Sequence, residues 1–228
     1  MFYFIWYFIW YFTIVPIGLL VIHPFHKIGI LEYGRYCFKE LKLKSIITKE
    51  SEYIKEGFIL ANHRCYFDFY WDTFISQGSI VGRRLAFLLF LFPSIYLYLN
   101  TGIIIINRCK DRREDIFKKM IKYKRVLFYP EGTRLRYTTL DSVEDIKRYL
   151  RYGILKEIYN YNTLPVQLQI TSNKELVIDE RKLKINKGVT VKTFISSPIY
   201  PAEFENEQDF YNEIADKWFK AWKYTHVT

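Results

Sequence analysis

Short continuous apolar runs recur along this chain, and longer stretches with helical spacing of apolar residues lie between them. The runs at 58–61, 103–106 and 126–129 predict buried strands, because a strand covered on both faces needs no polar positions. We expect 103–106, a run of isoleucines, to occupy a central position in the sheet. Further strands are expected at 46–48, 164–170, 175–178, 182–185 and 189–195.

Helical spacing is clearest at 66–77, 142–158 and 206–222, where apolar side chains recur on one face. The segment 28–44 is expected to form a further helical or interfacial element. Strands alternating with helices indicate an α/β fold with a mixed central sheet flanked by helices. We expect one domain at 45–228, preceded at 1–44 by a membrane-anchoring helical segment.

Residues 2–22 carry no charge, and a helix of this length reaches across a bilayer core. The first half is mostly Phe, Tyr and Trp, and the latter two favour the membrane interface, so an interfacial helix competes with a spanning one. Lys27, Arg35 and Lys39 follow this segment. Their charge predicts that the remainder lies on the cytosolic side of a membrane, the endoplasmic reticulum in a eukaryote.

The composition favours anionic partners, because 34 basic residues against 24 acidic ones give a net charge of +10. No nucleic-acid-binding motif is present, so lipid phosphate and a phosphorylated cofactor remain as partner classes. Cys37, Cys65 and Cys109 have no metal-binding or redox spacing, which predicts free thiols in a reducing compartment. The four histidines are scattered, and no metal is expected.

A histidine and an aspartate follow the strand at 58–61 in the stretch Asn62-His63-Arg64-Cys65-Tyr66-Phe67-Asp68. The two side chains can meet if His63 lies in the loop before a helix and Asp68 in its first turn. A carboxylate held against one imidazole nitrogen leaves the other free to act as a base. Cys65 as a nucleophile is a weaker alternative, because no second base is evident.

The strand at 126–129 leads into a second polar loop, Pro130-Glu131-Gly132-Thr133-Arg134. Pro and Gly predict a tight turn, and the arginine fork suits phosphate oxygens. Glu131 can orient that fork or bind a substrate hydroxyl. Arg108, at the end of the isoleucine strand, is a second candidate phosphate ligand.

Taken together, Asn62-His63 with Asp68, followed by Pro130-Glu131-Gly132-Thr133-Arg134, resembles the glycerophospholipid acyltransferase family. Two weaker blocks agree with this resemblance, Gly102 to Arg108 and Leu164-Pro165-Val166. Asn107 stands where many relatives carry Asp. The resemblance implies that His63 and Asp68 are catalytic and that the substrate is held by Asn62, Arg108, Glu131, Gly132, Thr133 and Arg134.

The same resemblance implies acyl transfer from acyl-CoA, a co-substrate rather than a bound cofactor, to 1-acyl-glycerol 3-phosphate, giving phosphatidic acid. Arg64 and the polar insert from Leu135 to Tyr149 resemble the branch that acylates lysophosphatidylinositol and lysocardiolipin. A transacylase, and a non-catalytic protein that binds anionic lipid, remain alternatives. The expected partners are these substrates and membrane lipids.

A second apolar run, from Leu85 to Leu99, is interrupted by Pro93. A membrane span here would place His63 and Arg134 on opposite sides of the bilayer. We therefore expect a re-entrant or interfacial helix next to the active site, where it would help to admit an acyl chain.

Overall fold

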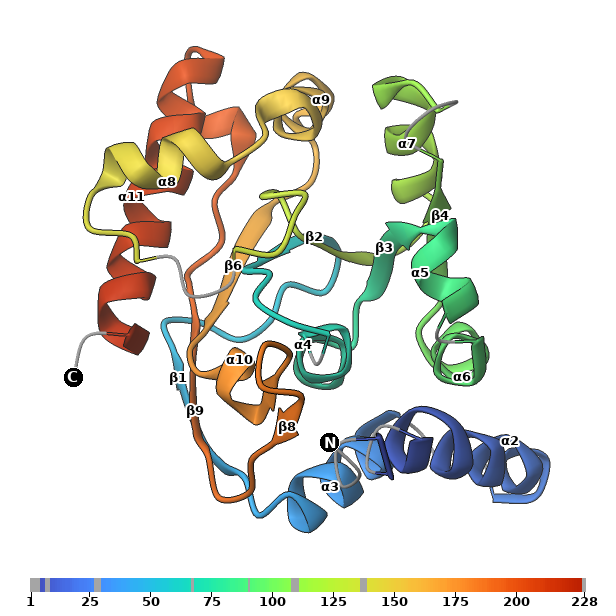
Figure 1. Cartoon of the computed structure of the whole chain (residues 1–228). Helices are drawn as coiled ribbons and strands as arrows, with labels where there is room; N and C mark the ends of the chain where they lie inside the picture. The colour runs from blue at the N-terminus through green and yellow to red at the C-terminus, as the bar shows by residue number, and fades with distance from the viewer. Residues whose placement is uncertain are drawn as a thin grey trace.

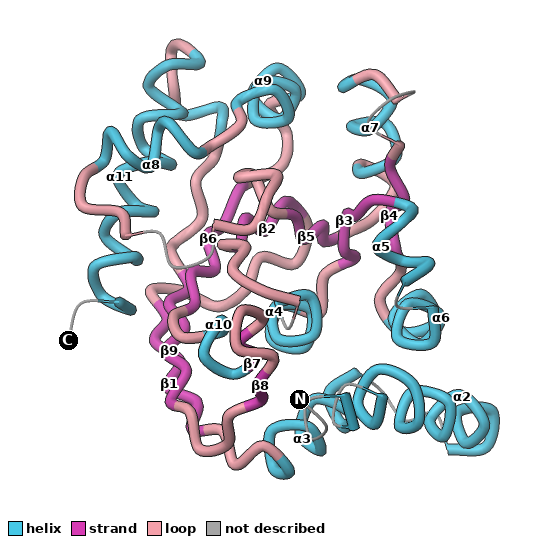
Figure 2. The backbone as a smooth tube through the Cα atoms, viewed as in Figure 1, coloured by secondary structure: helices cyan, strands magenta, loops and turns pink. Residues whose placement is uncertain are grey.

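The computed structural model describes residues 5–6, 9–26, 30–66, 68–89, 91–107, 111–135 and 139–226. One sheet of seven strands crosses the molecule in the order β1-β9-β6-β2-β5-β3-β4 (Figures 1 and 2). Its strands are β1 (Lys44–Lys49), β2 (Gly57–Ala61), β3 (Ser79–Arg83), β4 (Ile103–Ile106), β5 (Arg125–Phe128), β6 (Val166–Thr171) and β9 (Thr190–Ile195). β9 is antiparallel to β6 and the other pairings are parallel, so the expected mixed sheet is confirmed.

Helices cover both faces of this sheet, because side chains alternate along its buried strands. Phe58 and Leu60 of β2 belong to one hydrophobic core, and Ile59 and Ala61 to the other. The first core is covered by α7 (Arg113–Met120), α8 (Val143–Tyr149), α9 (Tyr152–Tyr161) and α11 (Glu207–His226). The second is covered by α3 (Ile30–Glu40), α4 (Asp68–Ser76), α6 (Leu91–Asn100) and α10 (Lys174–Val177).

The register of the parallel strands brings two polar loops to the same edge of the sheet. Leu60 of β2 is paired with Phe128 of β5, and Ile80 of β3 is paired with Leu127. The loops after Ala61 and Phe128 therefore leave the sheet side by side, and β3 ends beside them at Arg83. The carboxyl ends of parallel strands are where α/β proteins bind ligands.

Three expectations for single elements are wrong. The isoleucine strand is β4, which lies at an edge of the described sheet, and its Ile105 is 48% exposed. The helix expected at 142–158 is two helices, since Leu150 has an extended backbone that ends α8. The strand expected at 175–178 is mostly the short helix α10, followed by β7 (Ile178–Asp179), which pairs with β8 (Lys184–Ile185).

The N-terminal segment contains a π-helix, η1 (Trp10–Ile14), which continues into α2 (Val15–His26). Residues 1–4, 7–8 and 27–29 of the expected anchoring segment lie outside the described residues. Within the described ranges, every helix is too short or too polar to cross a bilayer. The second apolar run is divided into α5 (Arg84–Leu89) and α6, at the right of Figure 1. The remaining element is a short 3-10 helix, η2 (Pro201–Glu203).

Candidate active site

His63 and Asp68 meet as the sequence predicts. His63 lies in the loop after β2, and Asp68 is the first residue of α4. The distance from His63 Nδ1 to Asp68 Oδ2 is 2.8 Å. Asp68 is fully buried, and the backbone N–H groups of Arg64 and Cys65 also donate to its Oδ2. The carboxylate therefore fixes the imidazole and leaves Nε2 available as a base.

Tyr129, directly after β5, supports the imidazole from one side. Its ring stacks on that of His63 with centroids 4.4 Å apart and planes 15° from parallel. The Tyr129 hydroxyl donates to Asp72 Oδ2 at 3.1 Å. Burial raises the pKa of Tyr129 well above its ordinary value, so the phenol remains a donor. The imidazole is thus held by hydrogen bonding and by stacking.

The two polar loops are joined by direct hydrogen bonds. The His63 N–H donates to Glu131 Oε2 at 2.6 Å, and the Leu135 N–H donates to His63 O at 2.8 Å. Between these contacts, Gly132 has φ 67, a left-handed conformation that favours glycine. The structure thus brings together two loops that lie far apart in the sequence.

Asn62 and Glu131, both expected to contact substrate, are buried and are not among the residues that line the cavity. Asn62 is fully buried, and its side chain exchanges two hydrogen bonds with the Thr171 backbone, at 2.9 and 2.8 Å. Glu131 is 3% exposed and is occupied by the His63 N–H. Both residues position the loops on which the site is built.

A buried lysine that sequence analysis missed lies beneath the site. Lys174, the first residue of α10, places Nζ 2.8 Å from Asp72 Oδ2 and 3.7 Å from Asp68 Oδ1, and donates to Asn62 O at 2.6 Å. Burial acts to raise the pKa of Asp68, but Lys174 and His63 outweigh it and hold that pKa below its ordinary value. Burial, together with the nearby Asp68 carboxylate, raises the pKa of Asp72 to about 7, although Lys174 acts to lower it.

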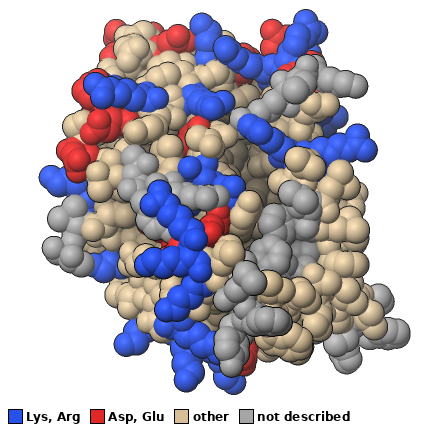
Figure 3. Space-filling model, in the orientation of Figure 1, with Lys and Arg blue, Asp and Glu red and all other residues tan. Residues whose placement is uncertain are grey.

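A cavity of about 660 Å³ opens at this edge of the sheet, and His63, Gly132, Thr133 and Arg134 line it. Most of the remaining wall is apolar and comes from α4, β3, α5, β4, α7, α9 and the end of β5. These residues are Phe69, Ile80, Val81, Leu85, Ala86, Phe87, Ile106, Ile116, Met120, Phe128 and Ile154. Lys and Arg side chains surround the hollow on the face seen in Figure 3.

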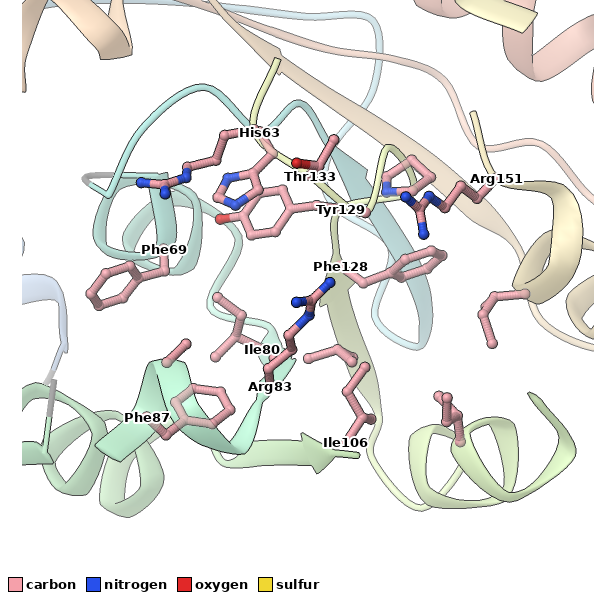
Figure 4. A pocket seen from close by; sticks show the side chains of 18 of the residues that line it. His63, Phe69, Ile80, Arg83, Phe87, Ile106, Phe128, Tyr129, Thr133 and Arg151 are labelled. Carbon is pink, nitrogen blue, oxygen red and sulfur yellow. The ribbon is translucent and has the colours of Figure 1, made fainter. Parts of the chain in front are cut away.

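Four arginines line the cavity: Arg83, Arg113, Arg134 and Arg151. Arg134 is paired with Glu180 at 2.9 and 2.8 Å and lies over the Tyr66 ring, so its charge is compensated. Among the described residues, the other three guanidinium groups have no ion-pair partner. Figure 4 shows Arg83 reaching into the cavity between His63 and Ile106. The expected phosphate ligand Arg108 lies outside the described residues.

Cys65 is 1% exposed and does not line the cavity. Its thiol points at Asp68 Oδ1, 3.3 Å away, and at the Lys174 carbonyl, 3.2 Å away. A substrate in the cavity cannot reach this sulfur without rearrangement, which argues against a thiol nucleophile. The described part of the chain contains no cluster of His, Cys, Asp and Glu that could hold a metal ion.

Comparison with known proteins identifies the fold. No protein-family model matches the chain, and no curated protein sequence does. The crystal structure of the 1-acyl-sn-glycerophosphate (LPA) acyltransferase PlsC from Thermotoga maritima matches it with a TM-score of 0.68 at 14% identity. The match covers 87% of this chain and 79% of that one. The resemblance to the glycerophospholipid acyltransferases is thereby confirmed at the level of the fold.

Proposed function

We propose that this protein is an O-acyltransferase that moves an acyl group from acyl-CoA to the free hydroxyl of a lysophospholipid. The simplest acceptor is 1-acyl-glycerol 3-phosphate, which would give phosphatidic acid. The observation that carries the proposal is a carboxylate-oriented imidazole opening into a cavity that combines apolar walls with arginines. An amphiphile with a phosphate and a hydrocarbon chain matches both properties of that wall.

The proposed reaction uses His63 as general base and then as general acid. Nε2 removes the proton of the acceptor hydroxyl as its oxygen attacks the thioester carbonyl. The buried carboxylate of Asp68 stabilises the imidazolium that forms. The tetrahedral intermediate collapses by breaking the C–S bond, and the imidazolium returns its proton to the thiolate of coenzyme A. The ester is formed and the enzyme is restored.

Two guanidinium groups near His63 are candidates for the acceptor phosphate. Arg83 has no acidic partner among the described residues and points into the cavity (Figure 4). Arg134 lines the same cavity, but a phosphate bound to Arg134 would have to share its guanidinium group with Glu180. Arg83 is therefore the stronger candidate, because it binds an anion without breaking an existing ion pair.

Association with a membrane surface belongs to the same proposal. The substrates are amphiphiles, and α5 and α6 expose several large apolar side chains beside the cavity. The net charge of +10 favours a surface with anionic headgroups. An interfacial placement supplies the acceptor directly from the bilayer, with the catalytic portion on the cytosolic side.

The proposal is tested by measuring thiol release from palmitoyl-CoA with lysophosphatidate, lysophosphatidylinositol and lysocardiolipin as acceptors. We expect His63→Ala to reduce turnover by about a hundred- to ten-thousand-fold, the usual contribution of general-base catalysis. Circular dichroism and vesicle binding should match those of the wild type, since His63 is on a surface loop.

Normal turnover in folded His63→Ala would exclude the mechanism. A wild-type protein that binds lipid vesicles but releases no thiol with any acceptor would favour the non-catalytic alternative. Thiol-independent transfer between two phospholipids would favour the transacylase.

A further inference from the structure

The cavity continues into a second hollow on the side away from Phe69. This hollow, of about 470 Å³, is lined by Arg113, Arg151, Tyr152, Gly153, Lys156, Glu207 and Tyr211. Arg113, Arg151 and Gly153 line both spaces, so the two hollows adjoin at these residues. Figure 4 shows Arg151 next to Phe128 at the right, with His63 and Phe69 to the left. A substrate that occupies both spaces extends past the two arginines.

The charge at this junction is uncompensated. Lys156 Nζ lies 3.4 Å from Glu207 Oε2, so that pair is neutral overall. Arg113 and Arg151 are exposed, and neither has an acidic partner within the described parts of the chain. Two guanidinium groups that line a cavity and have no counter-ion are available to bind an anion.

The side chain of Arg113 and the backbone of Arg151 each contact a neighbouring segment. A Cβ atom on Gly153 would lie 2.8 Å from Arg113 Nε, so the Arg113 side chain packs directly on the glycine. The Arg151 N–H donates to Pro130 O at 3.0 Å, which ties it to the Glu131 loop. Arg151 occupies the N-cap position of α9, whose first turn contains no acidic residue, and the helix dipole adds to the positive potential there.

Resting on the proposed acyl transfer, we propose that Arg113 and Arg151 form a second anion subsite that binds a phosphate ester of a substrate. This phosphate is distinct from the one next to the reacting hydroxyl near Arg83. Two substrates carry such a group: coenzyme A, through its phosphates, and a lysophospholipid whose headgroup bears an additional phosphate. The subsite thus sets which donor or acceptor binds well, without taking part in the chemistry.

The test compares Arg113→Met/Arg151→Met with Arg112→Met/Arg148→Met. The control loses the same charge from neighbouring positions, but Arg112 and Arg148 line neither hollow and have 82% and 78% exposed side chains. Calorimetric titration measures the affinity of each double variant for free CoA and dephospho-CoA. A second titration uses hexanoyl-lysophosphatidylinositol 4-phosphate and hexanoyl-lysophosphatidylinositol.

We expect the Arg113/Arg151 variant to bind one phosphorylated ligand about tenfold or more weakly than the control, as for loss of charge-assisted hydrogen bonds. A loss confined to CoA assigns the subsite to the donor, and a loss confined to the additional inositol phosphate assigns it to the acceptor. Equal binding of all four ligands by the two variants overturns the subsite. These titrations need no turnover. If the wild type were inactive but the Arg113/Arg151 variant still bound a phosphorylated ligand more weakly than the control, the proposed reaction would be contradicted and the subsite would stand.

Discussion

The reactivity assigned to His63 depends on three neighbours that act on different parts of the residue. Asp68 holds Nδ1, Tyr129 stacks on the ring, and Glu131 accepts the backbone N–H. The first contact follows from local spacing, because both residues leave the same strand-loop-helix unit. The other two come from a loop about seventy positions away, and their geometry follows from the pairing of β2 with β5.

Glu131 shows how burial changes a role expected from residue type. The carboxylate of a glutamate in a Pro-Glu-Gly turn is expected to be exposed and to contact a substrate. In the folded chain, burial raises the pKa of Glu131 to about 8, from an ordinary value of 4.5, although the His63 N–H lowers it. Near neutral pH the native protein therefore keeps a proton on Glu131 that the unfolded chain releases.

Glu131→Gln should alter the pH dependence of stability. The pKa of Glu131 is raised in the folded state. Its contribution to wild-type stability is therefore largest below pH 4.5 and is lost as the pH rises to about 8. Glutamine stays neutral and keeps an oxygen for the His63 N–H. The melting temperature of the variant relative to the wild type should rise from pH 5 to pH 8 and then level off.

Differential scanning fluorimetry across that range measures the effect. Glu205→Gln, at an exposed position, removes the same charge and supplies the control. A constant difference between Glu131→Gln and the wild type at every pH would show that Glu131 is ionised in the native state.

At the scale of elements, Lys174 links three parts of the fold that carry the site. Its ammonium contacts Asp72 of α4 and the Asn62 carbonyl after β2, while its own backbone begins α10. The side chain is fully buried. A buried cation between two carboxylates fixes the relative placement of these elements, and through Asp68 it fixes the orientation of His63.

Lys174→Met should destabilise the protein by about 3–5 kcal/mol, because Asp68 and Asp72 would be left buried without a cation. Lys174→Met/Asp72→Asn should recover part of that loss, since only one buried carboxylate then remains. Chemical denaturation of the two variants measures both effects, with Lys182→Met as the control at a 79% exposed side chain. A double variant no more stable than Lys174→Met would refute the charge-balance explanation.

Helices and strands were predictable where the hydrophobic pattern of the sequence agrees with the side chains that are buried in the structure. β2 and α4 lie within about two residues of the expected ranges, and the loop between them holds the candidate base. The strand expected at 175–178 was wrong because apolar residues there pack as one turn of helix, with Val177 buried. The position of β4 was wrong because strand order depends on crossovers, which a run of isoleucines does not encode.

At the scale of the whole molecule, exposed apolar side chains gather on α5 and α6. Leu88 is 57% exposed, Leu91 47%, Tyr98 64% and Leu99 52%. α2 packs beside α6 and exposes Val21. Leu85 of α5 belongs both to this surface and to the cavity lining, so the surface reaches the candidate site. An apolar surface of this kind is typical of a membrane or partner contact.

Leu88→Glu/Leu91→Glu should weaken binding to vesicles of phosphatidylcholine and phosphatidylglycerol, because charge would enter the proposed interfacial surface. Vesicle flotation measures the bound fraction. Ile46→Glu/Ile47→Glu provides the matched control, since these exposed residues belong to β1 at the opposite edge of the sheet. Equal loss in both variants would remove the reason for assigning α5 and α6 to the membrane surface.

The sequence by itself predicted the fold class, from the alternation of strands with helices, and the tight loop that presents Gly132 to Arg134, from its Pro and Gly. It also allowed His63 to meet Asp68 on the condition that Asp68 lies in the first turn of a helix. Only the tertiary structure decided that Asn62 and Glu131 are buried supports, that Lys174 neutralises the carboxylates, and that Arg83, Arg113 and Arg151 face one cavity. These facts depend on which strands become neighbours, and strand order arises from packing of the whole chain.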